Sequence, residues 1–215
     1  MKTNIILFFL LSISRIGHTQ TFEESLSDAL AKFESTDTLQ YKLAAVNRID
    51  LIRNKWNDRW EAYYYGAYAK LTVSYLLSDE KQRDGMIDQA EVDLNKAREF
   101  RKVADDELSV MDAYVANARI AVNGGSRWRK YGAIFDAKLE EAKKVNPNNP
   151  RIYLLKGQSL FHTPKAFGGG PKKALPYFEK AASYFASDSK DGLKKPHWGN
   201  ASNEFFVQEC KRLIE

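Results

Sequence analysis

The sequence predicts an all-helical protein, built as a solenoid of about four antiparallel helix pairs with a C-terminal capping helix. Three observations predict it. Amphipathic segments with helical spacing fill the chain after residue 20, and brief polar breaks separate them. A pattern of three apolar residues at positions i, i+4 and i+7, with at least one alanine in each copy, starts at Ala45 and returns at residues 90, 135 and 174, an interval typical of helical arrays. No stretch alternates apolar and polar residues long enough to indicate a strand.

A secretory signal peptide is expected over residues 1–20. Lys2 precedes the apolar run from Ile5 to Leu11, and small and polar residues follow it. The run is too short to span a bilayer, which takes about 20 residues. The alternative is the apolar N-terminus of a cytosolic protein, which the charged start and polar exit disfavour. We therefore expect an exported, periplasmic protein without a transmembrane span in the mature chain, residues 21–215.

The charge distribution disfavours nucleic-acid binding, and the cysteine count excludes a disulfide within the chain. The net charge of +5 falls to about +3 when Lys2 and Arg15 leave with the signal peptide, and the remaining bases are interleaved with acids. Because nucleic-acid binding needs a clustered basic surface, we expect no nucleic-acid partner. Cys210 is the only cysteine, so no disulfide can form within the chain.

Local signals divide the mature chain into elements. Thr21 and Glu24 fit a capping box, Asp58 is a candidate N-cap, and Asn149 can cap a helix whose first residue is Pro150. The expected helix pairs cover residues 21–55, 58–103, 105–145 and 150–186, and the capping helix covers 201–215.

Small residues recur where paired helices should touch. Gly within a helix costs about 1 kcal/mol relative to Ala, so Gly66 and Gly157 are best explained by close helix packing. The expected structural contacts of the repeats are Gly66, Ala90, Ala97, Ala118, Ala142, Gly157, Ala174, Phe178 and Ala181.

The segment NPRIYLLKG at 149–157, followed by KALPYFEKA at 173–181, resembles a tetratricopeptide repeat. It has the aromatic, Gly, Ala, aromatic and Ala order of that family, with Pro at the boundary. The units here are longer than the usual 34 or so residues, and the resemblance is specific only from about 146 to 186. Segment 162–170 is also similar to exported repeat proteins of Bacteroidetes-like bacteria. A weaker similarity is to the periplasmic repeat partner of TRAP-type transporters. The family implies a right-handed solenoid that binds a protein or peptide without catalysis.

Candidate chemistry is sparse. The glycines at 168–170 precede Lys172 and Lys173, but a phosphate loop needs a different spacing after a strand, so an inter-helix loop is expected. Whether that loop binds anything stays open. His162 and His197 lie far apart without a carboxylate motif, which disfavours a metal site. We expect no enzyme activity, no cofactor and no metal.

An aromatic run from Trp60 to Tyr75 contains Tyr63, Tyr64, Tyr65 and Tyr68. Such a density indicates either a recognition surface, with ring edges in solvent, or packing against neighbouring helices. The sequence leaves both alternatives open.

The resemblance also implies where a partner would dock. In the family, the first helix of each pair lines the concave face. Spacing from the small residues then gives the expected partner-binding side chains as Tyr63, Lys70, Asp112, Arg119, Gln158, Phe161 and His162. The main expectation is a non-catalytic scaffold of the cell envelope that binds a peptide or protein on this face. The alternative is a periplasmic binder of a small solute or apolar ligand, with association with a transporter left open. The identity of the partner and the oligomeric state are not predicted.

Overall fold

The computed structural model describes residues 20–101, 105–188 and 192–215. The expected signal peptide lies outside these ranges except for Gln20. The described residues form nine α-helices and two short 3₁₀ helices, and none of them lies in a strand, as the sequence predicts. The α-helices are α1 (Phe22–Glu34), α2 (Leu39–Lys55), α3 (Trp60–Ser74), α4 (Glu80–Phe100), α5 (Asp106–Val122), α6 (Gly124–Val145), α7 (Pro150–His162), α8 (Pro171–Phe185) and α9 (Asn200–Ile214). The 3₁₀ helices are η1 (Lys165–Phe167) and η2 (Gly192–Lys194).

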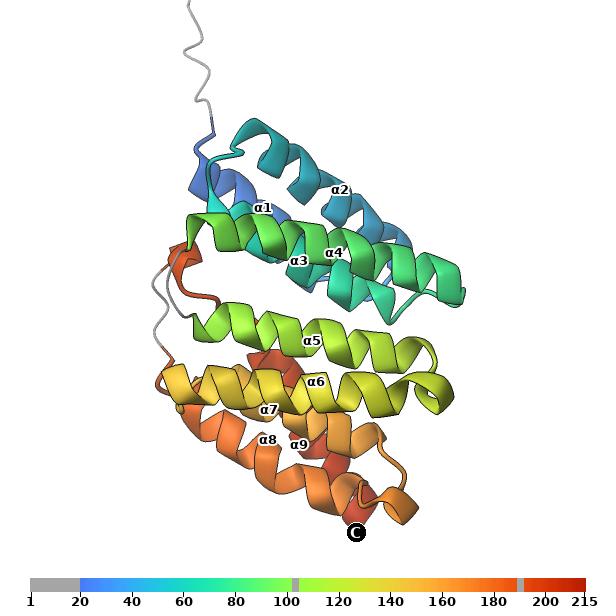
Figure 1. Ribbon diagram of the computed structural model, residues 1–215. Coiled ribbons are helices and arrows are strands. Elements are labelled where there is room, and N and C mark those ends of the chain that lie inside the picture. Colours follow the sequence, from blue (N-terminus) through green and yellow to red (C-terminus); the bar gives the residue numbers. More distant parts are fainter. Residues whose placement is uncertain (1–19, 102–104, 189–191) are drawn as a thin grey trace, which may run out of the picture.

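The helices stack in chain order, from α1 and α2 at one end to α8 and α9 at the other (Figure 1). The most extensive packing joins α3 to α4, α5 to α6 and α7 to α8, whereas α4 meets α5 less extensively. Helix α9 packs on α8 and also touches α7. No helix among the described residues has the length and apolarity that crossing a bilayer would require.

Local capping explains several helix starts. The Thr21 hydroxyl accepts from the Glu24 amide at 3.2 Å, and the Glu24 carboxylate accepts from the Thr21 amide at 3.0 Å, so the predicted capping box is confirmed. Asn149 caps α7, and Pro150 is its first residue, as predicted. The prediction for Asp58 was wrong: α3 begins at Trp60, and its N-cap, Arg59, makes no capping side-chain hydrogen bond.

Small residues lie at the helix contacts. Each alanine of the expected repeat set, together with Phe178, is fully buried. A Cβ added at Gly157 would lie 2.6 Å from the Phe178 ring, and one at Gly66 would lie 3.1 Å from the Asp93 carboxylate. Any side chain at Gly157 would therefore push α7 away from α8, because packed interiors have no spare volume.

Candidate functional site

The expected concave residues of α3 face neighbouring helices instead of solvent. Lys70 is 1% exposed and donates to Asp50 of α2 at 2.5 Å and to Asp93 of α4 at 2.7 Å. Tyr63 stacks on Phe100 of α4 and donates its hydroxyl to the Asn57 carbonyl at 3.1 Å. The expectation that Lys70 lines an open groove was wrong, because spacing puts it on one face with Tyr63 but does not say which neighbour that face meets.

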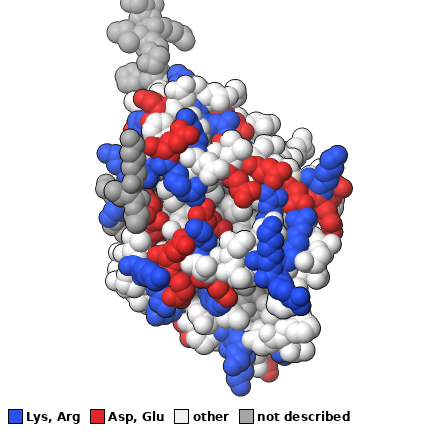
Figure 2. Space-filling model, viewed as in Figure 1, with Lys and Arg blue, Asp and Glu red and all other residues white. Residues whose placement is uncertain are grey.

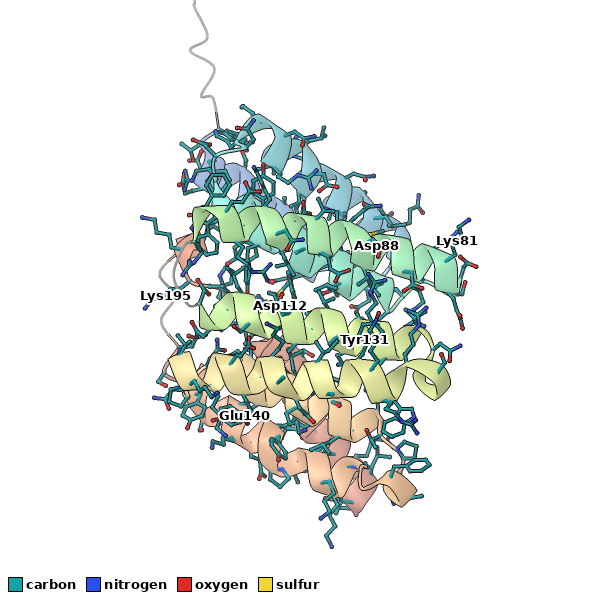
Figure 3. All side chains as sticks on the ribbon, in the orientation of Figure 1. Lys81, Asp88, Asp112, Tyr131, Glu140 and Lys195 are labelled. Atoms are coloured by element: carbon teal, nitrogen blue, oxygen red, sulfur yellow. The ribbon has the colours of Figure 1, made fainter. Side chains whose placement is uncertain are left out.

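The α5 residues Asp112 and Arg119 share a face, as their spacing predicts, and this face points toward α4. Arg98 donates to Asp112 at 2.6 Å, and Arg119 donates to Asp84 at 2.8 Å, to Glu91 at 2.5 Å and also to Asp88. Figure 3 labels Asp112 and Asp88 on the two facing helices. Arg119 is therefore committed to a structural ion cluster and does not face an open groove.

The same cluster perturbs the titration of one of its carboxyl groups. The two terminal guanidinium nitrogens of Arg127 donate hydrogen bonds to Asp84, at 2.6 and 2.7 Å. Arg119 adds a third charge-assisted hydrogen bond to the same carboxylate. These bonds favour the ionised carboxylate. They lower the pKa of Asp84 from 3.8 to about 2.

The α7 residues of the expected groove meet the capping helix. Gln158 donates to Ser202 of α9 at 3.2 Å, and Phe161 packs edge-on to Phe206 with ring centroids 5.2 Å apart. His162 lies at the exposed rim of this contact, and desolvation by its neighbours lowers the pKa of its imidazole. The seven expected residues thus fall into three separate contacts and do not form one groove.

The aromatic face of α3 and α5 is covered by the chain's own residues 192–199, which we call the strap. Trp198 stacks on Tyr68 and Tyr114, with ring centroids 4.8 and 5.8 Å away. Its indole N–H donates a hydrogen bond to the Tyr64 hydroxyl at 2.9 Å. In Figure 1 the strap, drawn red, lies near the α1 and α3 end and returns behind α5 to α9. Tyr64 and Tyr65 are buried, while Tyr75 is 37% exposed, so the packing alternative holds for most of the aromatic run.

A buried arginine anchors the strap. Arg151, at the start of α7, is 1% exposed and donates to Glu107 and Asp188 at 3.1 Å each, and to the Pro196 carbonyl. At the end of the strap Gly199 has φ +105°, and an added Cβ would lie 2.7 Å from Leu154. An external peptide therefore cannot occupy these positions while the strap is in place. No sequence pattern indicated the strap, since its partners are far away in the chain.

An open cleft lies on the opposite face of α5. It has a volume of about 380 Å³, within the range of about 300–1,000 Å³ for small-molecule sites. At 3.6 residues per turn, Asp112, Val115 and Ala116 share one side of α5, and Tyr114 points to the other side, toward the strap. The lining comes from three helices: Glu91, Leu94, Asn95 and Arg98 of α4; Asp112, Val115 and Ala116 of α5; and Tyr131, Ile134 and Lys138 of α6.

The cleft combines an apolar floor with charged groups. Leu94, Val115 and Ala116 are buried beneath it, whereas Ile134 is 38% exposed. Asp112 lies between two cations, 2.6 Å from the Arg98 guanidinium and 3.6 Å from the Lys138 ammonium. Figure 2 shows acids and bases intermixed on this face, so no field of a single sign surrounds the cleft. Only Asp112 among the seven expected residues lines it.

Comparisons with known proteins give one informative likeness. No known family profile matches the sequence, and no curated protein matches it. Among solved structures, the chain is similar to the HusA haemophore from Porphyromonas gingivalis, with 29% sequence identity and a TM-score of 0.75. The match covers 93% of this chain and 98% of that one. The chain is therefore similar, over nearly its whole length, to a helical protein named for carrying haem.

Proposed function

We propose that this protein is a non-catalytic binder of a porphyrin-type ligand, held in the cleft between α4, α5 and α6. The observation that carries the proposal is the pairing of an apolar floor with two basic groups at one site. A haem-type porphyrin has a flat apolar ring with two carboxylates on one edge. The likeness to a haemophore supports the same ligand class. Of the two functions expected from the sequence, the alternative is thus the better supported.

The residues of the cleft fit such a ligand. The ring would lie over the buried Leu94 and Val115 and would cover Ile134, which is 38% exposed. Ile134 is the residue that gains burial, since burying apolar surface contributes about 25 cal/mol per Å². Arg98 pairs with Asp112 at 2.6 Å, and Lys138 pairs with Glu141 at 2.8 Å. Both cations would turn from these partners to the carboxylates of the ligand, because charge-assisted hydrogen bonds to carboxylates are the stronger kind. Tyr131 supplies a phenol, one of the side chains that hold haem iron in proteins.

The architecture and the location are part of the proposal. We infer that the helix pairs are tetratricopeptide-like units in a right-handed solenoid, on the basis of the buried small residues and the segments 149–157 and 173–181. Export rests on the expected signal peptide at residues 1–20. A protein or peptide partner would have to bind outside the face that the strap covers.

Titration of the purified protein with haemin, and separately with metal-free protoporphyrin, tests the ligand. We expect saturable binding with a shifted Soret band for both. Ile134→Glu places a carboxylate on the apolar side of the cleft and should weaken binding at least tenfold, by like-charge repulsion and desolvation. Val145→Glu is the matched control, because Val145 is 46% exposed on the same helix, outside the cleft. Equal affinities of the two variants would refute the site.

A further inference from the structure

A second hollow lies at the other end of the stack, beside α1 and α2. It has a volume of about 620 Å³ and shares no residue with the cleft. The lining residues are Gln20, Ser25, Arg48, Leu51, Ile52, Lys55 and Trp56. Leu51 is 62% exposed, so part of its wall is apolar surface in contact with solvent.

Among the described residues, no carboxylate pairs with the basic groups of this hollow. Arg48, Ile52 and Lys55 follow one another at helical spacing and lie on one face of α2. Neither Arg48 nor Lys55 forms an ion pair with a carboxylate of the described residues, and the Lys55 ammonium lies 4.0 Å from the Trp56 ring centroid. Arg53 of the same helix, in contrast, pairs with both Asp50 and Asp93. The hollow therefore carries two cations that no carboxylate in the described part of the chain pairs with.

A serine hydroxyl in the same wall also lacks a partner. Ser25 of α1 is 4% exposed and lines the hollow, and its hydroxyl forms no hydrogen bond within the described part of the chain. Ser74 of α3, which is 1% exposed, donates to the Leu71 carbonyl at 2.6 Å. The Ser25 oxygen is not one of the fully enclosed unpaired side-chain atoms, so it is open to the hollow. A ligand oxygen in the hollow can accept a hydrogen bond from it.

We propose that this hollow binds an anionic amphiphile, a single-chain fatty acid or a lipid with the same acidic head and apolar body. The head would lie between Arg48, Lys55 and the Ser25 hydroxyl. The chain would lie along Leu51, Ile52 and the Trp56 indole. The two cations and the unpaired hydroxyl select an acidic oxygen group, and the apolar wall selects the rest of the molecule. This site is independent of the porphyrin site.

Calorimetric titration of the protein with monomeric palmitate, hexadecyl phosphate and hexadecanol tests the head-group chemistry. We expect both acids to bind, with the alcohol at least tenfold weaker, because it lacks the charge. Equal binding of the alcohol would overturn the proposal. Binding only to vesicles that contain anionic phospholipid, without binding of monomeric acid, would also overturn it, since a surface and not a cavity would then be recognised.

Substitutions in the hollow test whether palmitate binds there. Arg48→Gln with Lys55→Gln should weaken palmitate binding about tenfold or more. Lys32→Gln with Lys211→Gln removes the same charge from exposed positions elsewhere and should leave binding unchanged. Ser25→Ala should weaken binding while leaving the melting temperature of the free protein unchanged or higher, because no hydrogen bond within the fold is lost. If palmitate binds the Arg48/Lys55 variant as tightly as the parent, or if that variant loses haemin binding instead, the assignment is wrong.

Discussion

Replacement of Arg151 by methionine should be among the most destabilising single changes in this protein. Methionine keeps a long, flexible side chain but removes the cation that is buried beside Glu107. Glu107 would keep its bonds from the Tyr64 hydroxyl at 2.7 Å and the Asn149 amide at 2.8 Å, and would lose its ion-pair partner. Breaking a buried pair by removing one partner costs about 3–5 kcal/mol.

The other contacts of Arg151 change this figure little. Asp188 is 26% exposed at its side chain, so its pair with Arg151 contributes about 1 kcal/mol or less. The Pro196 carbonyl loses a donor, which loosens the strap. The expected total of about 3–5 kcal/mol corresponds to a fall in melting temperature of roughly 6–20 °C for a chain of this size.

Guanidinium unfolding followed by circular dichroism measures the loss. The double variant Arg151→Met with Glu107→Gln should be more stable than Arg151→Met alone, since no unpaired charge remains buried. A loss below about 1 kcal/mol for the single variant would refute the reasoning. So would a double variant whose loss equals the sum of the two single losses.

Four further substitutions test packing, acid stability and ligand charge. Gly157→Ala should cost about 1–3 kcal/mol by overpacking Phe178. Gly132→Ala, which meets no atom within 4 Å, should instead stabilise α6 in the same denaturation assay. The pKa of Asp84 is about 2 in the folded protein, below its ordinary value, so the stability it contributes is full above about pH 4 and is lost as pH falls through about 2. The difference in melting temperature between the parent and Asp84→Asn should therefore shrink toward pH 2, and a constant difference would contradict this. Asp112→Asn removes a carboxylate that competes with those of the porphyrin, and a unit charge at 4 Å is worth about 1 kcal/mol even in water. Protoporphyrin should bind this variant about fivefold more tightly, and its dimethyl ester should bind it unchanged.

Helix content and helix starts were predictable because their signals are local. The capping box at Thr21 and the Asn149–Pro150 start of α7 involve residues within one turn of each other. The prediction for Asp58 failed because aspartate is a favourable capping residue, but it lies one position before the actual N-cap, Arg59. The small packing residues were predictable for the same reason as the helices: their spacing repeats.

The functional face was harder to predict because helical spacing fixes which residues lie together, not what they meet. Asp112 and Arg119 do share a face, but it looks toward α4. Lys70 is covered because it pairs with Asp50 and Asp93 on the neighbouring helices. These partners are 20 and 23 residues away in the sequence, so no local pattern indicates the pairing. The contact between Trp198 and Tyr64 joins residues 134 positions apart, and no short-range pattern reports such a pairing. The cleft likewise exists only once α4, α5 and α6 are placed.

The strap also limits how many helices can lie between α3 and α7. Arrays of stacked repeats ordinarily tolerate gain or loss of a unit, because each unit touches only its neighbours. Here Trp198 must reach Tyr68 of α3 while Gly199 stays against Leu154 of α7, so a unit inserted or deleted between α3 and α7 would separate the two ends of one short peptide. Homologues that keep the strap should therefore vary in loop length and surface charge but have the same number of helices. They should also unfold in a single step instead of fraying from their ends.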